Sequence, residues 1–128
     1  MIVADTSALM EILLEQPKAD SCAAVLVAES EVAMSAATMA EALIVADRRG
    51  LALEMAALID GLGFTIATLS PADARRVVEA YGRWGKGVHP AGLNFGDCFA
   101  YALAKGWDVP LLYVGDDFAQ TDVKAALT

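Results

Sequence analysis

Acidic side chains follow two apolar segments of this chain, where a parallel β-sheet would place ligand-binding groups. Asp5 comes directly after Met1–Ala4, and Asp116 and Asp117 come one glycine after Leu111–Val114. Short apolar runs of this kind are typical of buried strands. In open parallel sheets, ligands bind where the strands end. We therefore expect the two strands to be neighbours and their acids to face one crevice.

Two further acids are expected on helices that border the same crevice. Asn94 can cap a helix that begins at about Phe95, and Asp97 then falls in its first turn, where the helix dipole favours a negative charge. Glu41 lies among apolar residues of a helix expected over 36–49. That helix only has to cross the edge of the sheet for Glu41 to reach the other acids.

Each acid also has a purely structural explanation. Asp5 could cap the following helix, and Thr6 or Ser7 could fill that role equally well. Glu41 could simply reach solvent from its apolar helix. Asp97 could interact only with the helix dipole, and the Asp116-Asp117 pair could be ordinary turn residues. Only the combination of acids, from separate parts of the chain, predicts a shared site.

Carboxylates gathered in one crevice repel one another strongly unless cations neutralise them. No histidine or cysteine is expected nearby, so the ligands would all be hard oxygen atoms, which favour Mg²⁺ or Mn²⁺ over zinc. Carboxylate-bound divalent ions are a recurring device for phosphodiester hydrolysis, in which they activate water and stabilise the charge on the reacting oxygens. The only histidine, His89, lies in a Gly/Pro-rich loop, which argues against a Ser-His-Asp triad.

The elements that must position these acids alternate along the chain. We expect helices at 8–15, 18–28, 36–49, 51–62, 71–84 and 95–105, the last ending at Gly106, and strands at 1–4, 31–34, 64–69 and 111–114, with an edge strand at 123–127. Strands that alternate with helices give an α/β fold with a mainly parallel sheet of four to five strands. A chain of 128 residues is expected to form a single domain, residues 1–128.

The composition narrows the environment and the partners. The apolar fraction of 57% is high, yet no apolar run approaches the length of a membrane span, so part of that surface is expected to face a protein partner. Cys22 and Cys98 are far apart and look like core residues of a cytoplasmic protein without a signal peptide. The net charge of −8 argues against unaided binding to nucleic acid.

The ordered set of motifs resembles the PIN-domain ribonucleases, and most closely the VapC toxins of bacterial toxin–antitoxin pairs. The motifs that carry the resemblance are Asp5-Thr6-Ser7, Glu41, Asn94-Phe95-Gly96-Asp97, Gly115-Asp116-Asp117-Phe118 and Thr121-Asp122. The resemblance implies a three-layer α/β/α sandwich and Mg²⁺-dependent endonucleolytic cleavage of RNA, with Mn²⁺ as a second candidate ion. It also implies a homodimer and inhibition by a VapB-type antitoxin.

The family's acidic residues can be carried over to matching positions. The resemblance assigns catalytic roles to Asp5, Glu41, Asp97 and Asp116, with Asp5, Asp97 and Asp116 as metal ligands. Many relatives have a hydroxyl residue two positions before the fourth acid, but this chain has Val114 there, so the choice between Asp116 and Asp117 stays open. Asp122 would be a further acid beside the site, and Thr6 or Ser7 would either cap the first helix or bind a water or phosphate oxygen.

The sequence also bears on two alternative functions. A haloacid-dehalogenase-like phosphatase would need a second Asp at position 7, where this chain has Ser7, and a catalytically silent interaction domain could keep all the acids.

Contacts with the RNA backbone are expected from some of Arg48, Arg49, Arg75, Arg76, Arg83 and Lys86. Apolar surface on the helices at 36–46 and 51–62 is expected to contribute to the dimer.

Overall fold

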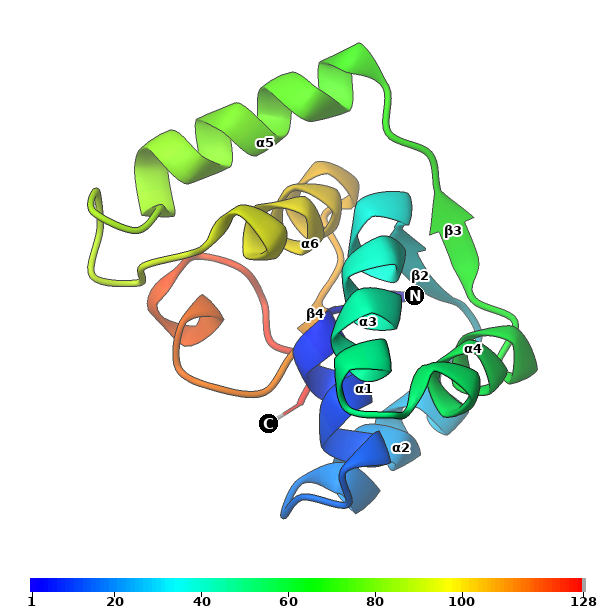
Figure 1. Ribbon diagram of the computed structural model, residues 1–128. Coiled ribbons are helices and arrows are strands. Elements are labelled where there is room, and N and C mark those ends of the chain that lie inside the picture. The colour runs from blue at the N-terminus through cyan, green and yellow to red at the C-terminus, as the bar shows by residue number, and fades with distance from the viewer. Residues whose placement is uncertain (128) are drawn as a thin grey trace.

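The computed structural model describes residues 1–127, in which helices and strands alternate as expected (Figure 1). The strands are β1 (Ile2–Ala4), β2 (Val32–Ser35), β3 (Thr65–Ala67) and β4 (Leu111–Leu112). The helices are α1 (Thr6–Leu13), α2 (Ala19–Ala28), α3 (Ala36–Arg48), α4 (Ala52–Gly61), α5 (Pro71–Trp84) and α6 (Phe95–Trp107), followed by a 3₁₀ turn at Phe118–Gln120. None of the helices in this part of the chain has the length and apolarity needed to cross a bilayer.

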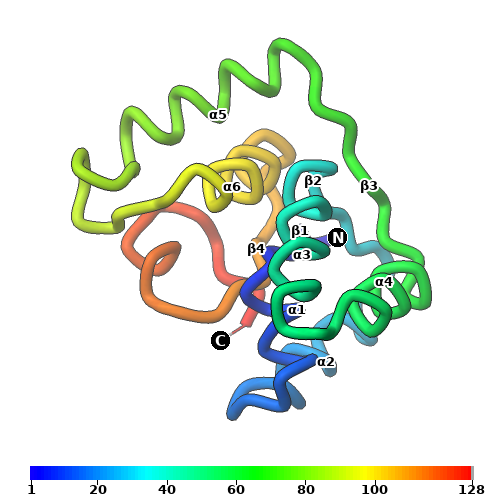
Figure 2. The backbone as a smooth tube through the Cα atoms, in the orientation of Figure 1, coloured from blue at the N-terminus to red at the C-terminus, as the bar shows by residue number. Residues whose placement is uncertain are grey.

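The four strands form one parallel sheet in the order β3-β2-β1-β4. Val3 pairs with Ala33 on one side and with Leu111 on the other, so β1 and β4 are neighbours although they lie at opposite ends of the chain (Figure 2). The expected adjacency of the two strand exits is therefore confirmed. The expected edge strand at 123–127 is reduced to an isolated parallel bridge between Leu111 and Ala125.

The sheet is covered on both faces, which confirms the three-layer α/β/α architecture. Ile2 and Ala4 of β1 point into a core shared with α1, α2, α3 and α4, whereas Val3 points into a second core shared with α5 and α6. This alternation follows from the two-residue period of a strand. Ala100 and Ala104 of α6 are fully buried, and their small side chains let this helix lie close to the sheet.

Helix termini follow the capping residues, and the largest shifts from the expected boundaries are at both ends of α1 and at the end of α6. Helix α1 begins two residues earlier than expected, because Asp5 itself serves as N-cap and its side chain accepts a hydrogen bond from the Ser7 N–H. Helix α6 does not stop at Gly106. It continues through Trp107 to Asp108, which takes the left-handed conformation that ends the helix, with a φ of 53°.

Candidate active site

Asp5 directly follows β1, and its two carboxylate oxygens have different surroundings. Oδ2 accepts hydrogen bonds from the Ser7 N–H at 3.0 Å and from the Ser7 hydroxyl at 2.7 Å. Oδ1 is buried and has no hydrogen-bond partner within residues 1–127, although the residue is only 2% exposed. Burial raises the pKa of Asp5 from 3.8 to about 6. The hydrogen bonds from Ser7 lower the pKa and so offset part of this rise, whereas the charges of Asp97 and Glu41 add to it.

The Ser7 hydroxyl links the exits of two neighbouring strands. It donates to Asp5 and accepts a hydrogen bond from the Val114 N–H at 3.1 Å, just after β4. Thr6 also has a role inside the protein, since its hydroxyl donates to Glu41 Oε1 at 2.7 Å. The two hydroxyls that follow Asp5 therefore orient acidic side chains and their flanking strands. From the sequence, these hydroxyls are expected either to cap the first helix or to bind a water or phosphate oxygen.

Glu41 reaches across from α3 to the start of α6. Thr6 of α1 holds one of its carboxylate oxygens, and the rest of the carboxylate lies against Gly96, which has no side chain to exclude it. Three helices thus converge on one carboxylate.

Asp97 lies in the first turn of α6, as the sequence predicted. The Asn94 side chain accepts from the Asp97 N–H at 2.8 Å, and Asp97 Oδ2 accepts from the Asn94 N–H at 3.0 Å, a reciprocal capping box. Burial raises the pKa of Asp97, and the hydrogen bond from the Asn94 N–H offsets part of this rise. The charges of Glu41 and Asp117 raise the pKa further. The structure therefore brings Asp5, Glu41 and Asp97 into electrostatic contact.

Asp116 and Asp117 are both exposed but lie in different surroundings. The charge of Asp117 acts on Asp97. Asp116 instead lines a separate hollow with Lys18, Tyr113 and others. Of the two candidates for the fourth acid, Asp117 is the one whose charge reaches the acidic group.

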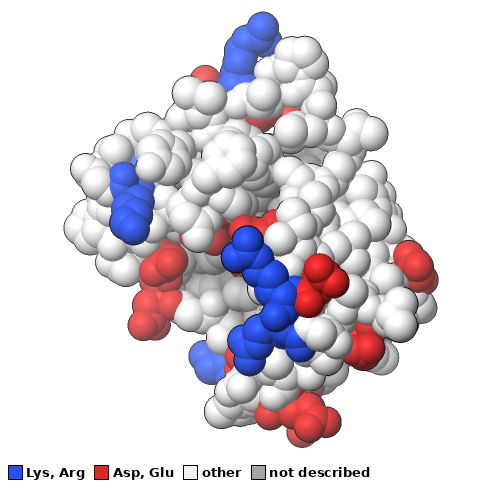
Figure 3. Space-filling model, in the orientation of Figure 1, with Lys and Arg blue, Asp and Glu red and all other residues white. Residues whose placement is uncertain are grey.

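The space-filling view shows acidic side chains inside a hollow of this face, between α3 and α6, with basic side chains crossing its rim (Figure 3). The basic rim lies over the C-terminal end of α3, where Arg48 is the last helical residue and Arg49 is the C-cap. Within residues 1–127, no three Asp, Glu, His or Cys side chains are close enough to hold one ion as they stand. In this arrangement Asp97 accepts a hydrogen bond from the Asn94 N–H and Glu41 accepts one from the Thr6 hydroxyl, so each carboxylate is held by a neighbouring donor.

Asp122 anchors the segment after β4 through contacts with α5 and α6. Its Oδ1 accepts a hydrogen bond from the Tyr101 hydroxyl, which in turn accepts one from Trp84 Nε1 at 2.8 Å. Its Oδ2 pairs with Arg83 at 3.5 Å and with Lys105 at 3.4 Å. Asp122 therefore holds a structural network together, and Arg83 is already paired within the protein.

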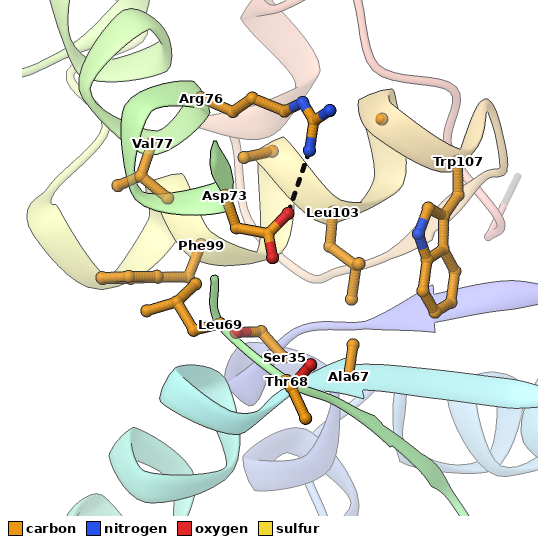
Figure 4. Close-up of a pocket in the computed structure, with 12 residues that line it drawn as sticks. Ser35, Ala67, Thr68, Leu69, Asp73, Arg76, Val77, Phe99, Leu103 and Trp107 are labelled. Carbon is orange, nitrogen blue, oxygen red and sulfur yellow. Dashed lines mark hydrogen bonds and ion pairs between the residues drawn. The ribbon is translucent and has the colours of Figure 1, made fainter. Parts of the chain in front are cut away.

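A cavity of about 170 Å³ lies between β3, α5 and α6, and none of the acids of the site lines it (Figure 4). Its charged residues, Asp73 and Arg76, form an ion pair with an N–O distance of 3.0 Å. The cavity is smaller than a usual ligand pocket and its charges are already neutralised. The hollow with the acids is therefore the better candidate for the site.

Comparison with known proteins agrees with the fold and the motifs. A family model for the PIN domain matches residues 2–124. The ribonuclease VapC of Mycolicibacterium smegmatis is 40% identical over 129 residues, which cover 97% of this chain and 98% of the relative. Ribonuclease VapC30 of Mycobacterium tuberculosis is 39% identical over 127 residues, which cover 95% of each protein. The chain belongs to the PIN-domain family, and its resemblance to VapC proteins is confirmed.

Solved structures support the same fold. The crystal structure of Mycobacterium tuberculosis VapC20, described as a sarcin-ricin loop cleaving toxin, matches with a TM-score of 0.80 at 15% identity over 100% of each chain. A toxin–antitoxin complex from Klebsiella pneumoniae matches with a TM-score of 0.72 at 20% identity, covering 95% of this chain and 93% of that one.

Proposed function

We propose that this protein is a VapC-type endoribonuclease, the toxin of a toxin–antitoxin pair, which hydrolyses RNA phosphodiester bonds with the help of Mg²⁺. The observation that carries the proposal is the buried Asp5 carboxylate, whose Oδ1 has no partner within residues 1–127 while the charges of Glu41 and Asp97 act on it. An ionised acid in such a place is unfavourable unless a cation accompanies it. The names of the VapC relatives support the choice of RNA as substrate.

The side chains fit a hard divalent cation because every donor is an oxygen atom. Asp5 and Asp97 would hold the ion, which would activate water and stabilise the charge on the reacting oxygens. The resemblance assigned Asp116 as the third ligand. We propose Asp117 for that place, since its charge acts on Asp97. Glu41, held by Thr6, would orient the attacking water.

The RNA and the antitoxin are inferred from charge and from the relatives. The net charge is −8, and Arg76 and Arg83 are already paired with Asp73 and Asp122, so few cations are available to RNA phosphates. Arg48 and Arg49, at the C-terminal end of α3, are the proposed phosphate contacts. So small a basic surface favours a structured RNA that is recognised by shape. A VapB-type antitoxin is the proposed inhibitor, supported by the structural similarity to a toxin–antitoxin complex.

We further propose that the protein is a cytoplasmic homodimer. Ile44 on α3 is 59% exposed and Leu53 on α4 is 82% exposed, so these helices present apolar surface that a second copy could bury. Met55 and Ile59 belong to the core of the protomer and are not part of such an interface. Light scattering at micromolar concentration should give twice the mass of one chain, and a monomer would contradict the proposal.

The proposed chemistry is tested by incubating the purified protein with structured RNA. Cleavage is expected with Mg²⁺ or Mn²⁺ and should stop when EDTA removes the ion. Cleavage that continues in EDTA would exclude the mechanism. No cleavage of any RNA would favour the catalytically silent interaction domain, and release of phosphate from phosphomonoesters would favour a phosphatase.

A further inference from the structure

Gly96 occupies the second helical position of α6, and the space beside it explains why the residue is glycine. A Cβ atom at this position would overlap Glu41 Oε2 and lie 2.7 Å from Glu41 Cδ. The backbone itself does not require glycine, because the φ of Gly96 lies outside the left-handed region. The obstacle to a larger residue is the end of the Glu41 side chain, which is flexible, so a substitution would move Glu41 without disrupting the helix.

Thr6 holds the other oxygen of the same carboxylate. Its hydroxyl donates to Glu41 Oε1 at 2.7 Å and also lies 3.5 Å from the Thr38 carbonyl oxygen on α3. Thr6 is buried at the first position of α1, so this donor has little freedom to move. One oxygen of Glu41 is therefore held by a hydrogen bond, and the other occupies the space left by the missing side chain of Gly96.

We propose that Gly96 and Thr6 are positioning residues that hold the Glu41 carboxylate beside Asp5 and Asp97, an inference that rests on the proposed nuclease function. The charge of Glu41 acts on both acids in this position. The helix N-terminus next to it favours a negative charge, which helps to keep Glu41 there. Displacing the carboxylate would move a negative charge away from the ion held by Asp5 and Asp97, and this would weaken cation binding even though neither Gly96 nor Thr6 is a ligand.

The first test compares two glycine-to-alanine variants. Gly96→Ala should weaken Mn²⁺ binding about 10-fold to 100-fold, the range found when residues that orient metal ligands are removed. Gly82→Ala is the matched control, because Gly82 lies in the exposed part of α5 and a Cβ there meets nothing within 4 Å in the described chain. Mn²⁺ affinity, measured by calorimetry, should be unchanged in the control.

A double-mutant cycle with Glu41→Ala, measured in the metal-free protein, then tests whether contact with Glu41 is what makes Gly96→Ala unfavourable. Alanine favours a helix over glycine, and Gly82→Ala should therefore raise the melting temperature by about 3 °C. Gly96→Ala should raise it by a similar amount only when Glu41 has been removed, and should lower it when Glu41 is present. The same effect in both backgrounds would overturn the inference.

Variants of Thr6 test the hydrogen bond that its hydroxyl donates to Glu41 Oε1. Thr6→Val keeps the shape but removes the donor, and should weaken Mn²⁺ binding in the same direction as Gly96→Ala. Thr6→Ser keeps the hydroxyl and should retain the wild-type affinity. Equal affinities for the Val and Ser variants would remove Thr6 from the proposal.

The possible failures can be told apart. Wild-type Mn²⁺ affinity in Gly96→Ala, together with weakened binding in Glu41→Ala, would overturn the positioning role of Gly96. Wild-type affinity in both variants would show that Glu41 takes no part in the ion site, and the inference would fail while RNA cleavage by the wild type still supported the nuclease. A wild-type protein that neither binds Mn²⁺ nor cleaves RNA would overturn the proposed function itself.

Discussion

Replacing Asp97 with Asn should lower the rate of RNA cleavage by roughly a thousandfold while the protein remains folded. The amide oxygen of Asn can still accept the hydrogen bond from the Asn94 N–H, so the capping box at the start of α6 is kept and only the charge is lost. Asp5→Asn should have a comparable effect, because an amide can still accept from Ser7 but no longer binds a cation well. Single-turnover cleavage at saturating Mg²⁺ measures the loss, and circular dichroism verifies the fold.

Full activity in either variant would remove that residue from the site. The fourth acid is decided by comparing Asp117→Asn with Asp116→Asn under the same conditions. We expect the larger loss for Asp117→Asn, since its charge acts on Asp97 whereas Asp116 lines a different hollow. The opposite order would restore the assignment of Asp116 that the family resemblance suggested.

In EDTA, the buried charge of Asp5 should make the protein less stable as the pH rises from about 4 to about 6. Burial raises the folded-state pKa of Asp5 to about 6, whereas 3.8 is its ordinary value. Between these values the folded protein holds more protons than the unfolded chain, so the free energy of unfolding falls with rising pH. A shift of this size corresponds to roughly 3 kcal/mol, which is fully lost above pH 6.

Urea unfolding in EDTA between pH 4 and pH 7.5 measures this effect as the difference between wild type and Asp5→Asn. The difference is the proper readout because Asp73 and Asp122 have lowered pKa values, and their contributions to stability run in the opposite direction. Asp5→Asn should lose less stability than the wild type over this pH range, because Asp97, whose pKa is also raised, is then the remaining acid of the site that contributes in this direction. Parallel curves for the two proteins would mean that Asp5 is not buried as a charge. Millimolar Mg²⁺ should restore stability to the wild type above pH 6 by mass action.

Much of the fold follows from local signals in the sequence. Ser70-Pro71 and Asn94 predicted the starts of α5 and α6, because capping geometry depends on neighbouring residues alone. Gly106 was a misleading stop signal, since a helix can pass through glycine when Asp108 adopts the left-handed conformation two residues later. The short parallel strands were predictable as apolar runs, but the loss of the edge strand was not.

The candidate site was predictable in its members but not in its details. The sequence posed capping and metal binding as rival roles for Asp5, whereas in the structure one oxygen caps α1 and the other is without a partner in the described chain. The contact of Glu41 with Gly96 joins residues of two helices that are far apart in sequence, and no local pattern encodes it. The motifs around Asp5 and Asp97 nevertheless contain the two residues that contact Glu41, because Thr6 follows Asp5 and Gly96 precedes Asp97.

The segment that follows β4, residues 113–122, carries both candidate fourth acids and is held by different kinds of interaction at its two ends. At its start, the Val114 N–H is held by the half-buried Ser7 hydroxyl, a neutral hydrogen bond. At its end, Asp122 is held partly by ion pairs with the exposed side chains of Arg83 and Lys105. Dissolved salt screens exposed ion pairs but barely affects a neutral hydrogen bond. Raising the ionic strength should therefore weaken the anchoring of Asp122 more than the anchoring of Val114.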